Sequence, residues 1–358
     1  MGVGREGQNL CSFQSRQSQA SHEDHNDAVC HIDYSNLTVA VVRAPPANLP
    51  YPPPSTDWNG RTYDLNQTVE VGVGYIKEAA LKGANFVAFP ELWFPGYYFG
   101  PQDGPTEFFN HYLDQGLVVN STNWNKLLQA AADNGVWLEF GFAHLDGDLT
   151  YMGQAIIDSD GQVVQIRHKL RPSGAERTIF SDGTMDMIKV HQTPWGRMGA
   201  LECWEHMWPS MTFSMHAQIE NFLIAAFPWG PDLGVDIGLE SADVSLASAR
   251  IYAVTGSTWV FMPSVGTAAI TAPNGTVVRQ IEASSGPLTE PMIYYSLNTS
   301  EFAGTPDYDL NGDFSWAALQ QINEGYPEYI PKEEGNFIPY RENSIARMKK
   351  EGPLPLNY

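Results

Sequence analysis

Short apolar runs with the composition of buried strands alternate with segments of helical periodicity along most of this chain. Residues 37–42 form a β-branched apolar run, and apolar residues recur at helical spacing from about residue 67 to residue 81. A second strand-like run follows at residues 85–89. A strand, a helix and a further strand in this order form a βαβ unit with two parallel strands. The alternation therefore predicts an α/β fold.

The same alternation continues to about residue 296. Helices are expected at residues 124–133, 209–220 and 241–254. Strands are expected at residues 136–142, 197–201, 222–226 and 259–262, and near Ala268 and Met292. Residues 152–158 and 162–167, joined around Asp160-Gly161, predict an antiparallel hairpin. Because no linker interrupts these elements, we expect a single domain over residues 36–300 that contains a mixed sheet.

The two ends of the chain differ from this domain. Residues 1–35 are polar and poor in large apolar groups, which predicts a disordered leader. Residues 301–358 are polar and rich in Pro and Gly. We expect this C-terminal tail to lie on the surface of the domain or at a subunit interface.

Charge and cysteine content restrict the class of partner. The net charge of -21 argues against nucleic acid and against an anionic membrane surface, and favours a small-molecule substrate. No apolar stretch is long enough to span a bilayer, the N-terminus lacks the apolar core of a secretory signal, and three cysteines are too few for a disulfide framework. We therefore expect a cytoplasmic protein, and expect its five glycosylation-type sequons to be unused; these begin at Asn36, Asn66, Asn120, Asn274 and Asn298.

Three polar residues follow predicted strands at points where their side chains could converge. Glu91, Lys169 and Cys203 each stand at or just beyond the end of a predicted strand. A thiol is a strong nucleophile only as the thiolate, so it needs a base and a positive field nearby. A carboxylate can take the thiol proton, and an ammonium can stabilise charge that develops on the substrate. The three groups together predict nucleophilic catalysis by Cys203.

The segments around these residues resemble the motifs of the nitrilase superfamily. Residues 89–97 (FPELWFPGY) are similar to its glutamate motif, residues 167–172 (RHKLRP) to its lysine motif, and residues 199–206 (GALECWEH) to its cysteine motif in the nitrilase form. Residues 173–183 resemble the stretch after the lysine, which carries a second glutamate, here Glu176. The resemblance extends over roughly residues 37–296.

The resemblance implies a role for each of these residues. Cys203 would be the nucleophile, Glu91 the general base and Lys169 the stabiliser of the charged intermediate, with Glu176 positioning Lys169 and Glu91. It also implies a four-layer α-β-β-α sandwich that pairs through its helices into a dimer or a larger, spiral homo-oligomer. No metal and no cofactor are implied. Glu205 and His206 either shape the environment of the leaving nitrogen or serve packing and subunit contact.

The nature of the substrate follows less directly. Trp93, Trp204 and Trp229 lie beside or after strand ends and are expected to line an apolar pocket for an aryl or arylalkyl nitrile; the competing interpretation is that they are core or interface aromatics. We expect hydrolysis of an organic nitrile to the carboxylic acid and ammonia, with amide as a side product. The alternatives are a nitrile or cyanide hydratase that releases the amide, and an inactive assembly protein of the same fold.

Overall fold

The structure is a computed structural model of the chain. It describes residues 35–52, 58–101, 103–230, 241–302, 311–329 and 340–356. The expected leader, apart from Ser35, and residues 303–310, 330–339 and 357–358 of the expected tail lie outside the described residues.

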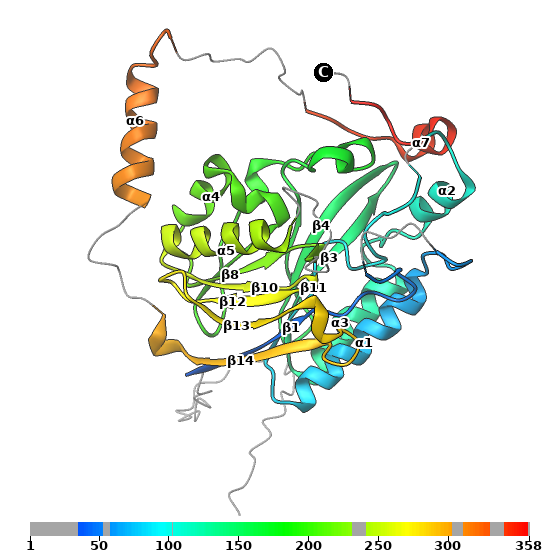
Figure 1. Cartoon of the computed structure of the whole chain (residues 1–358), viewed down its shortest axis with the longest axis horizontal. Coiled ribbons are helices and arrows are strands. Elements are labelled where there is room, and N and C mark those ends of the chain that lie inside the picture. The colour runs from blue at the N-terminus through cyan, green and yellow to red at the C-terminus, as the bar shows by residue number, and fades with distance from the viewer. Residues whose placement is uncertain are drawn as a thin grey trace, which may run out of the picture.

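Two six-stranded sheets face each other, and helices cover the outer face of each (Figure 1). Helices α1 (Leu65–Leu81) and α3 (Thr122–Asn134) pack on the first sheet, and α4 (Pro209–His216) and α5 (Ala242–Gly256) pack on the second. This confirms the four-layer α-β-β-α sandwich. The order of elements predicted a mixed sheet; the strands divide between two sheets, and each contains parallel and antiparallel neighbours.

The first sheet has the order β14-β1-β2-β3-β4-β5. Strands β1, β2 and β3 are parallel, and the other neighbours are antiparallel. The bounds of the strands are Asn36–Val42 for β1, Phe86–Ala88 for β2, Trp137–Asp146 for β3, Leu149–Ile157 for β4, Val163–His168 for β5 and Met292–Asn298 for β14.

The second sheet has the order β13-β12-β10-β8-β7-β6, with β7, β8 and β10 parallel. A separate two-residue pair joins β9 (Trp229–Gly230) to β11 (Val265–Gly266). The bounds of the sheet strands are His191–Gln192 for β6, Arg197–Glu202 for β7, Phe222–Ala226 for β8, Trp259–Met262 for β10, Ala268–Thr271 for β12 and Val277–Ile281 for β13.

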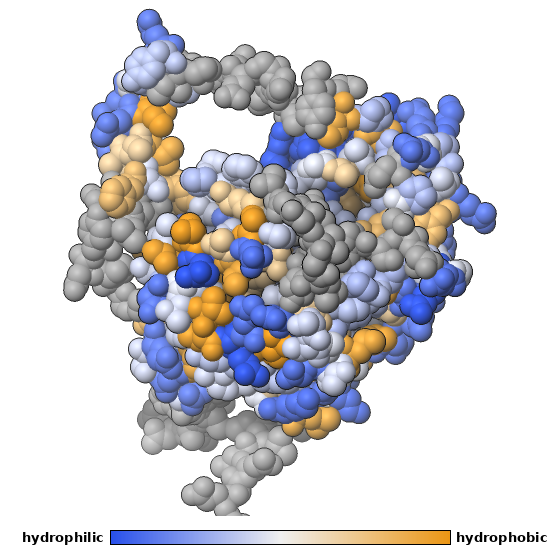
Figure 2. All heavy atoms as spheres, viewed as in Figure 1, coloured by the Kyte–Doolittle hydropathy of each residue, from blue (hydrophilic) through white to orange (hydrophobic). Residues whose placement is uncertain are grey.

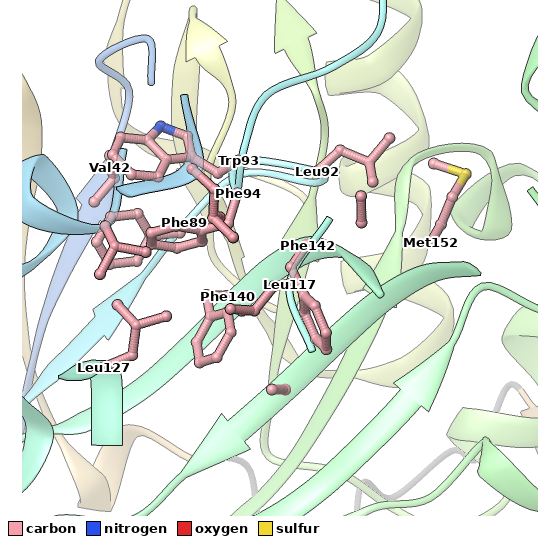
Figure 3. Packing of buried hydrophobic residues seen from close by; sticks show 14 of the residues in the cluster. Val42, Phe89, Leu92, Trp93, Phe94, Leu117, Leu127, Phe140, Phe142 and Met152 are labelled. Carbon is pink, nitrogen blue, oxygen red and sulfur yellow. The ribbon is translucent and has the colours of Figure 1, made fainter. Parts of the chain in front are cut away.

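The period-2 alternation of a strand explains how β1 serves two cores. Leu37, Val39 and Val41 lie in the cluster between the sheets, whereas Ala40 and Val42 lie in the cluster beneath the helices. Figure 3 shows Val42 in this helix-side cluster. Both faces of the strand are therefore removed from water, as its nearly continuous apolar sequence predicts.

Some elements differ from the sequence prediction. Helix α4 ends at His216, before the predicted residue 220, because the backbone turns left-handed at Ile219, where φ is 58°. Helix α2 (Glu107–Asp114) was not predicted, although Thr106 caps it by accepting a hydrogen bond from the Phe109 N–H at 3.0 Å. Strand β13 was also not predicted.

The described part of the C-terminal segment contains two α-helices. Helix α6 (Ala317–Glu324) stands away from the body of the domain in Figure 1, and Figure 2 shows hydrophobic residues along it. Residues 340–356 instead return to the domain and carry α7 (Ile345–Glu351), which packs beside α2. Asn343 is fully buried there and donates hydrogen bonds to the backbone oxygens of Arg177 and Phe180, at 3.0 and 3.1 Å. In the described part of the chain, no helix is long and apolar enough to cross a membrane.

Candidate active site

The three predicted reactive residues come from both sheets. Glu91 follows β2 and Lys169 directly follows β5 in the first sheet, while Cys203 directly follows β7 in the second. Glu91 and Lys169 are at most 1% exposed, and Cys203 is 8% exposed. The site therefore lies where strand ends of the two sheets meet, largely shielded from water.

Lys169 lies between two carboxylates. Its Nζ donates to Glu176 Oε2 at 2.8 Å and to Glu91 Oε1 at 3.3 Å. Glu176 stands on the 3₁₀ helix Gly174–Thr178 and also accepts the Ser173 N–H at 2.6 Å. Its other oxygen accepts the Tyr97 hydroxyl at 3.0 Å. These contacts fix Glu176 and, through it, the ammonium of Lys169.

Two glycines allow the backbone segments to approach this closely. A Cβ at Gly141 would lie 2.6 Å from the Leu92 backbone nitrogen and 2.7 Å from Glu91 Cα. A Cβ at Gly183 would lie 2.5 Å from the His168 backbone oxygen and 2.8 Å from that of Lys169. Larger residues at these positions would displace Glu91 or Lys169.

The backbone of Cys203 is held in a left-handed conformation, with φ of 43°. His206 Nδ1 lies 2.6 Å from the Cys203 backbone oxygen, and because a carbonyl only accepts, Nδ1 carries the proton. Glu205 accepts the backbone N–H groups of Glu202 and Leu170, each at 2.8 Å. Glu205 and His206 therefore both bind the backbone of the turn that carries Cys203.

A buried arginine supports Glu205. Arg167 donates to both oxygens of Glu205, at 2.7 and 2.9 Å, and to Gln154 at 2.9 Å. Burial raises the pKa of Glu205, but Arg167 outweighs it, so that the pKa lies below its usual value. Glu205 is therefore ionised and paired.

Burial dominates the protonation of the reactive groups. It raises the pKa of Glu91 well above its usual value, against the attraction of Lys169. Burial also raises the pKa of the Cys203 thiol well above its usual value, Glu91 raises it further, and Lys169 lowers it. Burial lowers the pKa of Lys169, but the charges of Glu176 and Glu91 outweigh it and raise the pKa overall. Cys203 is thus a thiol at rest, beside a carboxyl group with a strongly raised proton affinity and a charged ammonium.

Cys203 opens into a cavity with aromatic walls. Among the described residues it is lined by Tyr97, Ser173, Gly174, Ala175, Glu176, Cys203, Trp204, Phe227, Pro228, Trp229 and Ser245. Two of the three tryptophans expected at the pocket, Trp204 and Trp229, are among them.

The expectation for Trp93 was wrong. Trp93 is 1% exposed and packs among Phe89, Phe94 and Tyr75 in the core beneath the helices (Figure 3). Its indole N–H donates to the Ala44 backbone oxygen at 2.9 Å. The backbone turns left-handed at Leu92, with φ of 50°, so the side chains of Glu91 and Trp93 on either side of it take different directions.

Sequence reasoning missed several residues of the site. Tyr97 belongs to the glutamate motif and Arg167 to the lysine motif, so their motif positions were an available signal. Glu139 on β3 is fully buried and was hidden inside a predicted strand, whereas the equally buried Glu202 stood in the cysteine motif directly before Cys203. Within the described residues, no group of three or more His, Cys, Asp or Glu side chains is arranged to hold a metal ion.

Comparison with known structures supports the fold. An amidase from Nesterenkonia sp. superposes with a TM-score of 0.57 at 15% sequence identity, covering 81% of this chain and 97% of that chain.

Comparison with known sequences shows the family. An arylacetonitrilase of Aspergillus oryzae is 31% identical over 322 residues, covering 81% of this chain and 92% of the relative. Aliphatic nitrilases of Rhodococcus rhodochrous are 33% and 34% identical, and these alignments cover 64% and 55% of this chain but only 60% and 53% of the relatives, little more than half their length. The family model described as carbon-nitrogen hydrolase matches residues 38–304. The chain therefore belongs to the carbon-nitrogen hydrolase family, within the nitrilase superfamily.

Proposed function

We propose that this protein hydrolyses an organic nitrile to a carboxylic acid and ammonia. The observation that carries the proposal is the buried arrangement of Lys169 between Glu91 and Glu176, beside a thiol that opens into a cavity with aromatic walls. Related chains are named nitrilases, and one of them is aligned over 92% of its length. We therefore assign nitriles as the substrate class of this site.

The first half of the proposed cycle forms a covalent adduct. Glu91 takes the thiol proton while the Cys203 sulfur bonds to the nitrile carbon, and the nitrile nitrogen receives a proton to give a thioimidate. Lys169, held by Glu176, stabilises the negative charge that develops on that nitrogen.

The second half consumes two waters. Glu91 deprotonates the first water as its oxygen bonds to the thioimidate carbon, giving a tetrahedral intermediate. Protonation of its nitrogen breaks the carbon–nitrogen bond and releases ammonia, which leaves a thioester. A second water, deprotonated again by Glu91, adds to the thioester, and cleavage of the carbon–sulfur bond releases the acid and restores Cys203.

The tetrahedral intermediate also defines the competing product. If its carbon–sulfur bond breaks before the carbon–nitrogen bond, the product is the amide and only one water is consumed. A hydratase would therefore use the same residues, and the two reactions differ in which leaving group is protonated.

The cavity walls favour an aryl or arylalkyl substituent on the nitrile. Trp204, Phe227 and Trp229 provide apolar surface next to Cys203. Removing an aromatic ring from water onto such walls is favourable, whereas cyanide would leave them unused.

The deciding experiment incubates the purified protein with cyanide, an aliphatic nitrile and phenylacetonitrile, and measures acid, amide and ammonia. We expect phenylacetic acid and ammonia in equal amounts, with amide as a minor product. Amide alone would establish the hydratase, formamide from cyanide the cyanide hydratase, and no product from any of the three would favour an inactive assembly protein. Cys203→Ala is the control and should form no product.

We further propose that the protein forms a homo-oligomer through its α4–α5 side and acts in the cytoplasm. Trp208 at the start of α4, Ile219 beyond its end and Ile251 on α5 are 50%, 70% and 63% exposed. Large apolar groups exposed to this extent on neighbouring helices suit contact with a second copy. A reducing compartment suits a catalytic thiol. Light scattering of wild type and Ile251→Glu tests the assembly, and a smaller mass for the variant is expected.

A further inference from the structure

The reactive site is part of a larger buried cluster with more acids than cations. The described residues place five carboxyl groups and two cations there, each at most 6% exposed: Glu91, Glu139, Glu176, Glu202, Glu205, Arg167 and Lys169. Arg167 is occupied by Glu205, and Lys169 by Glu176 and Glu91. The cluster therefore cannot be neutral unless some of its carboxyl groups hold protons.

Glu202 is a carboxyl group in this cluster without a close side-chain partner. It is fully buried, and neither of its oxygens has a side-chain hydrogen-bond partner in the described part of the chain; the Glu205 N–H faces it in a capping box at the start of the 3₁₀ helix Cys203–Met207. The guanidinium of Arg167, which is already paired with Glu205, has its Nη1 atom 3.9 Å from Glu202 Oε2. Glu139 differs, because one of its oxygens accepts the Gln154 side-chain amide at 2.8 Å.

Glu202 also lies where its charge acts on the reactive groups. It directly precedes Cys203 and is within electrostatic reach of Glu91 and Lys169. Glu91 itself has one oxygen without a partner among the described residues, so a neighbouring negative charge is poorly compensated there. The groups that face Glu202 are Arg167 on β5, Lys169 and Glu176 beyond it, Glu205 after β7, Glu139 on β3 and Glu91.

We propose that Glu202 is a positioning residue that acts through Glu91: the negative charge of its buried carboxylate sets the pH at which Glu91 becomes available as the general base. The inference rests on the proposed function, because it assigns Glu91 the role of base. Burial raises the pKa of Glu202 to about 7, despite Arg167, so its charge changes near neutral pH. Wherever Glu202 is ionised, Glu91 loses its proton next to a charge that is already present.

The charge of Glu202 and the charge of Glu91 repel each other. A negative Glu202 disfavours a negative Glu91 and so raises the pKa of the base. Glu202→Gln keeps the shape of the protonated acid but removes that charge. The base then becomes available at lower pH, and the acid limb of thiol reactivity moves in the same direction.

The test measures alkylation of Cys203 by iodoacetamide across a pH series, with the modified site identified by peptide mass spectrometry. This readout needs no nitrile turnover. We expect the midpoint of the acid limb in Glu202→Gln to move down by about one pH unit, a shift typical of one nearby buried charge. If nitriles are not hydrolysed but this shift occurs, the proposed function fails and the coupling stands. An unshifted midpoint in a folded Glu202→Gln overturns the inference.

Glu139→Gln is the matched control, because it makes the same change at an equally buried acid whose charge is not among the main influences on the pKa of Glu91. Its midpoint should stay at the wild-type value, and an equal shift would refute a specific role for Glu202. If Glu202→Gln does not fold, the infrared carbonyl band of protonated buried carboxyl groups is followed in the wild-type protein. We expect one component of this band to disappear near pH 7, because the pKa of Glu202 is about 7. The absence of such a component overturns the inference.

Discussion

Lys169 Nζ lies closer to Glu176 than to Glu91, at 2.8 Å against 3.3 Å. The ammonium is thus held chiefly by a carboxylate that Tyr97 and the Ser173 N–H also fix in place. Glu91 keeps its second oxygen without a partner among the described residues. The difference between the two carboxylates favours different roles for them, in which Glu176 positions the lysine and Glu91 exchanges protons.

Glu176→Gln should release Lys169 from its stronger ion pair and let it move toward Glu91. We expect kcat for phenylacetonitrile to fall by about two orders of magnitude, because both groups lose the reactive geometry. Steady-state kinetics provides the measurement. Glu70→Gln, which removes a surface partner of Lys126, is the control and should keep wild-type activity. Full activity in Glu176→Gln would contradict the assigned role.

Gly141→Ala should displace Glu91 by steric contact. The new methyl group would meet the Leu92 nitrogen at 2.6 Å, and a displaced base lowers kcat by about 100-fold. Gly74→Ala is the comparison, since a Cβ there meets nothing within 4 Å on helix α1. That variant should retain activity and gain about 0.5–1 kcal/mol of unfolding free energy. Equal kinetics in the two variants would argue against close packing behind Glu91.

His206→Ala should loosen the backbone of the nucleophile. Without the 2.6 Å hydrogen bond to the Cys203 oxygen, the left-handed turn is less well held, and we expect kcat to fall about 10-fold or more. Burial lowers the pKa of His206 to about 4, so the neutral ring makes this bond. His206→Asn, which retains a donor, should recover part of the activity. If Ala and Asn behave alike, His206 fills space only.

Asn343→Ala should detach the C-terminal segment from the stretch that carries Glu176. The substitution removes two buried hydrogen bonds to the Arg177 and Phe180 oxygens, which leaves those acceptors unpaired and costs roughly 1–3 kcal/mol. Thermal and urea unfolding measure the loss. The exposed Asn125→Ala should change stability by less than about 0.5 kcal/mol. No difference between the two would mean that the segment does not brace the domain.

Glu202→Gln should alter how stability depends on pH. The folded-state pKa of about 7 exceeds the ordinary value of 4.5, so the folded chain binds this proton more tightly than the unfolded chain. The stabilisation is complete below pH 4.5 and is lost as the pH rises to about 7. Relative to wild type, the variant should therefore gain stability between these limits, by an amount on the order of 3 kcal/mol. Urea unfolding at both pH values measures the stability difference between variant and wild type. The same difference at pH 4.5 and at pH 7 would contradict this prediction.

The local patterns of the sequence were sufficient for most of the parallel strands and for three helices. Residues 222–226 and 259–262 are strands with the predicted bounds, because apolar β-branched and aromatic runs between turn residues have few other stable conformations. Short elements such as α2 and β13 escaped prediction because their apolar faces become apparent only against their neighbours.

The sequence by itself also predicted which residues carry the chemistry. Glu91, Lys169, Glu176 and Cys203 stand in short motifs next to strand ends, and adjacency along the chain is visible without a structure. Their order and spacing led to the family that the comparisons then showed.

Only the tertiary structure decided what surrounds those residues. Strand periodicity reports that two faces alternate, but not which sheet a strand joins, so the division into two sheets could not be read from it. The same limit separates Trp93, which turns into the core, from Trp204 and Trp229, which line the cavity. The burial of Glu202 and the contacts of Asn343 arise from segments distant in sequence, whose packing is a property of the whole fold.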